Sequence, residues 1–481
     1  MQYLSTRDSA LRVSAQEAIV RGLAPQSGLF VPETFPQADL DAWKNLSYSE
    51  LAEKVLAGFL TDYSADFLHT ATASTYGAAF GGKAGETVKV RDGLYSLELW
   101  HGPTCAFKDY ALQLMPKLLV EAKKMLGRTE TTRILVATSG DTGKAALAGY
   151  ADLDGIEIEV FYPNDGTSEI QHLQMATQKG ENVQVYAVQG NFDDAQTGVK
   201  KVFSDADVAA ELEKRGIRLS SANSINWGRL VPQIVYYFYA YFRLAEQGAV
   251  EWGKPVDFCV PTGNFGDILA GYYAKQMGLP VGRLVCASNK NNVLTDFLRT
   301  GTYDARRTFY KTTSPSMDIL ISSNLERLLY HVSGSSEKVA GWMQELSATG
   351  KYTVDAETLA KIQQSFAAGY ADDADGAAEI KARFDGDHYL CDTHTAVAFC
   401  VAETRRTDAP MVVLSTASPF KFPRDVLTAL GGAPASDFAA MAALTAGTGA
   451  EAPASLRELD KLEVRFKTVL QPADIRTAAL R

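Results

Sequence analysis

The segment Ile134-Leu135-Val136-Ala137-Thr138-Ser139-Gly140-Asp141-Thr142-Gly143 indicates the fold class. It begins as a continuous apolar run and passes into a loop of glycine and hydroxyl-bearing residues. A helix of small residues is expected from this loop to Tyr150. An uninterrupted apolar strand followed by a glycine loop and a helix is typical of a parallel sheet that is covered on both faces.

The same alternation recurs along the chain, so the expected class is α/β. Ligands are then expected at the carboxyl ends of the strands, where the loops leave the sheet. The further elements that the pattern predicts are strands at 157–162, 183–188, 258–260, 284–286 and 411–414, a turn at 163–166, and helices at 168–178 and from the loop at 262–267 to Met277.

Three regions differ from this pattern. Residues 1–95 alternate more weakly, which predicts a smaller leading domain. Residues 335–385 are helical in pattern and acidic, which favours an exposed helical insertion. Residues 431–456 are rich in Ala, Gly and Pro and are interpreted as a mobile loop before a last helical tail that ends at residue 481.

Composition excludes several classes of protein. The chain has 481 residues, 46% of them hydrophobic, and a net charge of 47 − 57 = −10. Enough apolar material is present for a sizeable core, and the acidic balance disfavours a general nucleic-acid binder, which needs clustered Lys and Arg. The apolar stretch from Leu230 to Leu244 is interrupted by Pro232, Gln233 and Arg243, so a buried helix is expected there and no membrane span.

Cysteine usage points to a reducing compartment. The five cysteines form no C-x-x-C pair, and the first residues lack the pattern of a signal peptide, so a cytoplasmic soluble protein is expected. His388, Cys391 and His394 lie close together in sequence with Cys400 nearby. They are interpreted as a strand end that runs into a helix, and no metal site is predicted.

Two glycine loops and one lysine carry the chemistry. The loop Gly263-Asn264-Phe265-Gly266-Asp267 follows a strand and begins a helix, where free backbone N–H groups and the helix dipole suit a phosphate. The loop at 138–143 has the same position and suits a carboxylate or a phosphate, or simply caps its helix. The loop at 138–143 is not a P-loop, which needs glycine at Thr138 and a hydroxyl residue at Ala145, and no G-x-G-x-x-G follows a strand, so a nucleotide cofactor is poorly supported.

Lys108 lies in His101-Gly102-Pro103-Thr104-Cys105-Ala106-Phe107-Lys108-Asp109. Its aromatic and small neighbours can partly desolvate the amine and lower its pKa, and a lysine of this kind can form a Schiff base. A solvated surface lysine is the alternative that this pattern leaves open.

Seven further segments occur in the order seen in one enzyme family. They are Tyr3–Arg7, Gly28–Glu33, Gly190–Gln196, Asn223–Arg229, Ser314–Ile319, Asp392–Ala396 and Thr416–Phe422. Together with the lysine segment and the two glycine loops, they resemble the threonine synthases, a branch of the tryptophan-synthase-β-like (fold type II) pyridoxal-phosphate-dependent enzymes. The resemblance extends across nearly the whole chain. It implies an N-terminal domain at 1–95, a catalytic region of two open α/β lobes at 96–430, the smaller lobe at about 105–225, and a tail at 431–481.

The resemblance also implies roles for individual residues. Lys108 is the Schiff-base lysine and the acid/base. The residues implied to bind pyridoxal 5'-phosphate are Lys108, Gly263, Asn264, Phe265, Gly266 and Thr416, the last through a neutral hydroxyl on the pyridine nitrogen. The residues implied or expected to bind substrate are Ser139, Gly140, Asp141 and Thr142 for the α-carboxylate, and Asn226, Arg229 and Lys421 for the substrate phosphate. The Asp141 carboxylate fits such a loop only if it faces away or is protonated, and orienting the loop or the cofactor is its preferred role.

The implied reaction converts O-phosphohomoserine and water to threonine and phosphate, and the protein is expected to be a monomer with a small-molecule substrate as its partner. A related fold type II lyase is the alternative. Three positions depart from the usual family pattern: Cys105, Lys144 and Ser418. Cys105 is interpreted as a small buried residue, Lys144 adds a charge near the anion site, and Ser418 stands where a histidine is usual.

Overall fold

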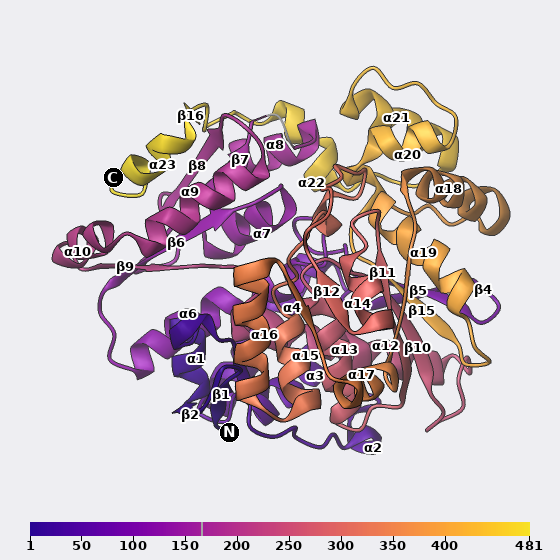
Figure 1. Ribbon diagram of the computed structural model, residues 1–481. Coiled ribbons are helices and arrows are strands. Elements are labelled where there is room, and N and C mark those ends of the chain that lie inside the picture. The colour runs from indigo at the N-terminus through magenta and orange to yellow at the C-terminus, as the bar shows by residue number, and fades with distance from the viewer. Residues whose placement is uncertain (165–166) are drawn as a thin grey trace.

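Two sheets form the framework of the computed structural model, which describes residues 1–164 and 167–481 (Figure 1). The large sheet has six strands in the order β14-β11-β10-β15-β5-β4, all parallel except the β4–β5 hairpin. Its strands are β4 (Glu86–Arg91), β5 (Leu94–Glu98), β10 (Val256–Pro261), β11 (Val281–Ser288), β14 (Phe366–Tyr370) and β15 (Met411–Ser415). Every residue of β10 is buried, as expected for a strand that is covered on both faces.

The smaller sheet is entirely parallel, with the order β16-β8-β7-β6-β9. Its strands are β6 (Thr131–Ala137), β7 (Ile156–Pro163), β8 (Val183–Val188), β9 (Ile217–Ser220) and β16 (Val469–Leu470). The helices that accompany it are α7 (Asp141–Tyr150), α8 (Glu169–Ala176), α9 (Phe192–Ser204), α10 (Ala206–Lys214) and α23 (Ile475–Ala478). The strands and helices predicted in this lobe are therefore confirmed, except that the predicted turn at 163–166 lies partly outside the described residues.

The large lobe surrounds its sheet with helices. They include α12 (Ile234–Glu246), α13 (Gly266–Gln276), α14 (Val293–Thr300), α15 (Leu325–Ser333), α16 (Ser336–Thr349), α17 (Ala356–Gln363), α18 (Asp373–Asp387), α19 (Thr393–Arg405) and α20 (Pro423–Ala429). Helix α12 is the predicted buried helix, and its side chains join the main core. Among the described residues, no helix has both the length and the apolar character that a membrane crossing requires.

The leading region packs its own small sheet and helices against the large lobe. Its elements are β1 (Tyr3–Ser5), β2 (Asp8–Val13), β3 (Phe30–Pro32), α1 (Ala15–Arg21), α2 (Leu40–Trp43), α3 (Tyr48–Phe59) and α4 (Ala65–Tyr76). The segment between the lobes contains α5 (Asp109–Leu112), α6 (Met115–Met125) and α11 (Trp227–Leu230). The expected boundary at residue 95 is displaced, because it falls inside β5 and both strands of the β4–β5 hairpin belong to the large sheet.

Two predicted regions are corrected by the structure. Residues 335–385 are mainly helical, as predicted, in α16, α17 and most of α18. They are not a purely helical insertion, because β14 forms the edge of the large sheet and β13 (Lys351–Thr353) pairs with β12 (Thr302–Asp304). Residues 431–456 are not one continuous loop: they contain the 12-residue helix α21 (Asp437–Thr448), begun by a Ser436 cap and ended at Gly449. Alanine is the strongest helix former, so the composition that was interpreted as a linker favours a helix.

The chain end is also not a purely helical tail. Strand β16 pairs in parallel with β8, and α23 packs against α9. Only α22 (Ala454–Arg457) and short turns precede β16 after α21. Figure 1 shows the yellow C-terminal elements lying beside the magenta strands of the small lobe, so this end of the chain completes that lobe.

Candidate active site

The small-lobe loop, residues 138–143, connects β6 to α7. Gly140 adopts φ 142°, which only glycine accepts readily, and a Cβ there would lie 2.5 Å from the Gln171 side chain. The Thr138 hydroxyl accepts the N–H groups of Gly140 and Gly143, each at 3.0 Å. Ser139 and Thr142 are half-buried. The loop therefore presents hydroxyl groups and a helix N-terminus, which suits a carboxylate.

The large-lobe loop, residues 262–266, connects β10 to α13. Phe265 has φ 63°, and no side chain of the described residues caps the helix that follows. A Cβ on Gly263 would lie 2.7 Å from the backbone oxygen of Ser316, so the close approach of these two segments requires glycine. The uncapped N-terminus and the absence of a Cβ leave backbone N–H groups for an anion such as a phosphate.

Lys108 lies immediately before α5, between these two loops. The N–H of Phe107 donates to the Thr416 carbonyl at 2.8 Å, which fixes the lysine segment at the end of β15. The Lys108 ammonium donates to Asp141 Oδ2 at 3.4 Å and to Ser316 Oγ at 3.3 Å, and only 9% of the residue is exposed. The structure thus brings together Lys108, Thr416 and both predicted loops.

The electrostatics around Lys108 favour a reactive amine. Burial lowers the pKa of Lys108, and the charges of Lys421 and Arg229 act in the same direction, while Asp141 opposes them. A lowered pKa makes the neutral amine that Schiff-base chemistry requires easier to form than in a solvated lysine.

Asp141 and Lys421 form a buried ion pair beside this amine. Lys421 is fully buried, its Nζ lies 2.8 Å from Asp141 Oδ1, and it also donates to the Thr104 carbonyl at 3.0 Å. Burial alone would raise the pKa of Asp141, but Lys421 and Lys108 outweigh burial and hold that pKa well below its usual range. Asp141 is therefore ionised and directed at side chains, with Gln171 as a further donor at 3.0 Å.

Two residues expected to hold the substrate phosphate have other partners. Asn226 caps α11 through the Gly228 N–H and donates to the Ile19 carbonyl at 2.9 Å, so its side chain is structural. Lys421 neutralises Asp141 instead. The physical reason in both cases is burial, because a polar group with 0–1% exposure must find its partners inside the protein.

Arg229 remains a candidate anion receptor. It is 3% exposed, its Nη1 donates to the Ala222 carbonyl, and its Nε has no partner among the described residues. No described carboxylate forms an ion pair with it, and burial lowers the pKa of Arg229 to about 10, so it is still a cation at neutral pH. A buried guanidinium without an acidic partner suits an anionic ligand.

Sequence reasoning assigned no role to several residues of the site. Asp267 lies in the first turn of α13, where Oδ1 accepts the hydroxyls of Tyr236 and Tyr237 and Oδ2 has no described partner. Burial raises the pKa of Asp267 to about 7. Ser316 contacts Lys108 directly. Both residues lie in segments that resemble the family's motifs. Their position within these motifs is the sequence feature that could have identified them as site residues.

The three departures from the family pattern are accommodated locally. Cys105 is buried at φ 61°, and burial raises the pKa of its thiol to about 11. Lys144 donates to Gln178 at 2.6 Å, and burial lowers its pKa to about 8. Ser418 caps a short turn through the Phe420 N–H. None of these side chains contacts Lys108 in the described residues.

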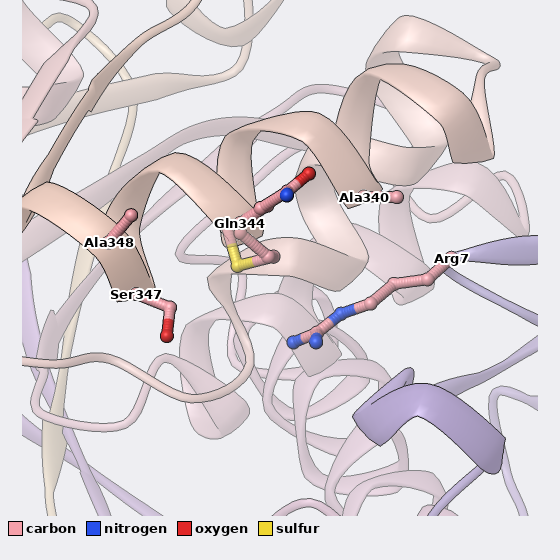
Figure 2. A pocket seen from close by; sticks show the side chains of 6 residues that line it. Arg7, Ala340, Gln344, Ser347 and Ala348 are labelled. Atoms are coloured by element: carbon pink, nitrogen blue, oxygen red, sulfur yellow. The ribbon is translucent and has the colours of Figure 1, made fainter.

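A surface cleft of about 450 Å³ lies elsewhere, between the leading region and α16. Figure 2 shows Arg7 extending beneath the helix that carries Ala340, Gln344 and Ser347. None of the predicted site residues lines this cleft, and the Arg7 guanidinium is paired with Glu326 at 2.6 Å. This cleft is therefore separate from the candidate site around Lys108.

The residues around Lys108 fit pyridoxal phosphate. The large-lobe loop is a cradle that a Cβ at Gly263 would fill, Lys108 supplies the amine for the aldehyde, and Thr416 is at hand as a neutral hydroxyl. The sequence family described as "Pyridoxal-phosphate dependent enzyme" matches residues 84–379. Fold and site thus define a pyridoxal-phosphate-dependent enzyme of fold type II, and its cofactor is pyridoxal phosphate.

The chain belongs to the threonine synthase family. The families described as "Threonine synthase N terminus" and "Threonine synthase, C-terminal" match residues 2–76 and 395–478. Threonine synthase of Pseudomonas aeruginosa is 40% identical over 90% of this chain and 92% of that protein. The crystal structure of PLP-bound threonine synthase from Brucella melitensis matches with a TM-score of 0.90 and 38% identity, covering 100% of this chain and 99% of that one.

Longer relatives also match. Threonine synthase-like 1 of Macaca fascicularis is 40% identical over 89% of this chain, and the match spans 60% of that protein. The chain therefore spans about 60% of the length of this relative. The resemblance stated from the motifs is confirmed at the level of family, fold and cofactor.

Proposed function

We propose that this chain converts O-phospho-L-homoserine and water to L-threonine and inorganic phosphate. The observation that carries the proposal is Arg229, a buried cation without a described acidic partner, close enough to Lys108 for its charge to lower the pKa of that amine. A substrate with a second anionic group, beyond the α-carboxylate, supplies the missing partner. Family membership supports the same reaction.

The cofactor, when bound, supplies an electron sink next to the substrate amine. Lys108 Nζ would hold the cofactor by its aldehyde, and the same nitrogen, once free, would take and return protons at the substrate carbons. Gly263, Asn264, Phe265 and Gly266 bind the cofactor phosphate through backbone N–H groups. The Thr416 hydroxyl would be the neutral partner of the pyridine nitrogen.

The remaining residues bind and orient the substrate. Ser139, Gly140 and Thr142 take the α-carboxylate at the N-terminus of α7, and Arg229 takes the phosphate with the bidentate geometry of a guanidinium. Asp141, neutralised by Lys421, orients Lys108 and repels no substrate carboxylate because its charge is internally balanced. Closing the two lobes around the site excludes bulk water from the reactive groups.

The proposal includes a monomeric, cytoplasmic enzyme. All five cysteines are free thiols, which supports a reducing compartment.

Product analysis tests the reaction. Purified holoenzyme given O-phosphohomoserine should release threonine and phosphate in equal amounts. Release of 2-oxobutyrate without threonine would contradict the proposal and favour a related lyase.

Two variants test the roles of individual residues. The Lys108→Ala variant should lose the visible absorbance of the Schiff base together with turnover. The Arg229→Gln variant should keep the absorbance and lose kcat/KM by about 100-fold or more.

A further inference from the structure

A turn that no predicted role includes contacts both the reactive amine and the phosphate cradle. This turn, Pro315–Met317, places Ser316 Oγ 3.3 Å from Lys108 Nζ. The Ser316 carbonyl oxygen is also the atom that a Cβ on Gly263 would meet at 2.7 Å. One residue therefore touches the catalytic lysine with its side chain and the large-lobe loop with its backbone.

His394 also holds this turn, through the backbone of Ser316. It is 2% exposed and lies in the first turn of α19, and its Nε2 accepts the backbone N–H of Ser316 at 3.1 Å. Its Nδ1 lies 2.7 Å from Asp392 Oδ2. Because Nε2 accepts a hydrogen bond, the ring proton belongs on Nδ1, where it donates to Asp392. Asp392 thus orients the ring, and the ring orients the peptide of Ser316.

The two acceptors of Lys108 differ in kind. Asp141 is already committed to Lys421 at 2.8 Å and to Gln171 at 3.0 Å. Ser316 is a neutral acceptor, and a neutral acceptor directs an N–H group without stabilising the charged ammonium as a carboxylate does. The charged groups that act on Lys108 are Asp141, Lys421 and Arg229, with Asp267 beyond them.

We infer that Ser316 is a further catalytic residue of this site and that His394 is the positioning residue that fixes it. The lysine amine, released when substrate binds, accepts a proton from a substrate carbon, and the resulting ammonium donates one N–H to Ser316 Oγ. The same proton returns to the substrate later, so Ser316 remains neutral throughout. The inference rests on the proposed role of Lys108 and adds Ser316 as the group that orients Lys108 Nζ.

Replacing Ser316 tests the aiming role. Ser316→Ala removes one oxygen from a half-buried turn and should fold normally. It should lower kcat by about 10- to 100-fold with KM nearly unchanged, because misdirecting a reacting atom has effects of this size. The rate at which apoenzyme forms the Schiff base with added pyridoxal phosphate should fall in parallel, while the equilibrium affinity for the cofactor stays within about threefold.

The control for Ser316 lies on the same segment. Thr313→Val removes a hydroxyl that contacts Asp373 instead of Lys108, and it should leave both rates unchanged. Equal rates in Ser316→Ala and the parent enzyme would overturn the inference. A loss of cofactor affinity as large as the loss of rate would also overturn it, since that pattern means that Ser316 merely supports the phosphate loop.

His394 is tested by conservative rescue. His394→Gln keeps an oxygen acceptor for the Ser316 N–H and should retain most of kcat, whereas His394→Leu should match Ser316→Ala. The double variant His394→Leu/Ser316→Ala should be no slower than either single variant, because both act through one hydrogen bond. If the losses of kcat in the two single variants multiply in the double variant, His394 acts separately from Ser316, and its positioning role is overturned.

These readouts separate the inference from the proposed function. Schiff-base formation uses cofactor and apoenzyme alone and does not depend on which substrate the enzyme turns over. If no threonine forms but Ser316→Ala still slows Schiff-base formation, the proposed reaction fails and the role of Ser316 stands. If threonine forms and Ser316→Ala is normal in both rates, the proposed reaction stands and the role of Ser316 fails.

Discussion

The two glycine loops have the same topology but are completed by different means. Each follows a parallel strand and begins a helix, and each lies beside Lys108. The small-lobe loop is closed by side chains: Thr138 accepts two of its amides, and Lys421 neutralises its aspartate. The large-lobe loop has no side-chain cap and is shaped by close backbone packing against Ser316.

This difference explains how the same strand–loop–helix motif suits a carboxylate in one lobe and a phosphate in the other. In the small-lobe loop, side chains of the protein already bind two amides and neutralise the aspartate. The loop then offers its hydroxyl groups and the partial positive charge of a helix N-terminus, which suits a carboxylate. A loop with free amides and no Cβ in the way suits a phosphate, which needs several donors at close range. The comparison predicts that changes in the small-lobe loop affect folding and substrate binding, and that changes in the large-lobe loop affect cofactor binding.

The largest effect is expected from Lys421→Met. This variant leaves the buried Asp141 carboxylate with only Lys108, at 3.4 Å, as its cationic partner. Removing one partner of a buried ion pair lowers the free energy of unfolding by about 3–5 kcal/mol, measurable by urea denaturation. The double variant Lys421→Met/Asp141→Asn should recover most of the loss, and unchanged stability in the single variant would show that Asp141 does not need this charge.

The second effect concerns the large-lobe loop. Gly263→Ala places a Cβ 2.7 Å from a backbone oxygen, which cannot rotate away. Affinity for pyridoxal phosphate should fall by about 100-fold, or ~2.7 kcal/mol, in a fluorescence titration. The matched change Gly140→Ala should instead raise KM for the substrate and leave cofactor affinity within a few-fold. Equal losses of cofactor affinity would remove the distinction between the loops.

The third effect is a pH dependence in the large-lobe loop. The pKa of Asp267 is about 7 in the folded protein against an ordinary 3.8. Between these values the folded protein keeps a proton that the unfolded chain releases, so the stabilisation present at low pH is lost as pH rises toward 7. Each pH unit of that window is worth up to about 1.4 kcal/mol, and Asp267→Asn should remove this part of the slope.

Glu159 provides the control for that measurement. Burial raises the pKa of Glu159 to about 7 as well, but this residue lies on β7 of the small lobe, beside Arg133. Glu159→Gln should remove a similar part of the slope. Adding pyridoxal phosphate should change only the part that depends on Asp267. If the cofactor changes both parts alike, Asp267 does not sense the phosphate site.

The smallest effect is expected from Thr138→Val, which leaves the amides of Gly140 and Gly143 without their hydroxyl acceptor. Stability should fall by about 1 kcal/mol and KM for the substrate should rise a few-fold, with cofactor affinity unchanged. Thermal unfolding and steady-state kinetics measure both. A loss of cofactor affinity would mean that the small-lobe loop also supports the phosphate.

Local pattern was enough to predict the strands and loops that build the site. The apolar run at 134–137, the run at 258–260 and the helices that follow them lie where periodicity placed them. Strand β14 was missed because Phe366-Ala-Ala-Gly-Tyr370 is short and contains residues of low strand preference. Strand β16 has two residues, too few to show any period, and exists because β8 offers a free edge.

The sequence by itself determined the fold class and the two glycine loops, because these depend on neighbouring residues and on the conformations that glycine alone allows. Its motifs also predicted Lys108 as the reactive lysine, through their resemblance to one enzyme family. Only the tertiary structure decided which partners the polar and charged residues of the site have. Asn226 became a helix cap, Lys421 became the partner of Asp141, and Ser316 came to face Lys108. Such roles depend on burial and on contacts between distant segments, which no local pattern contains.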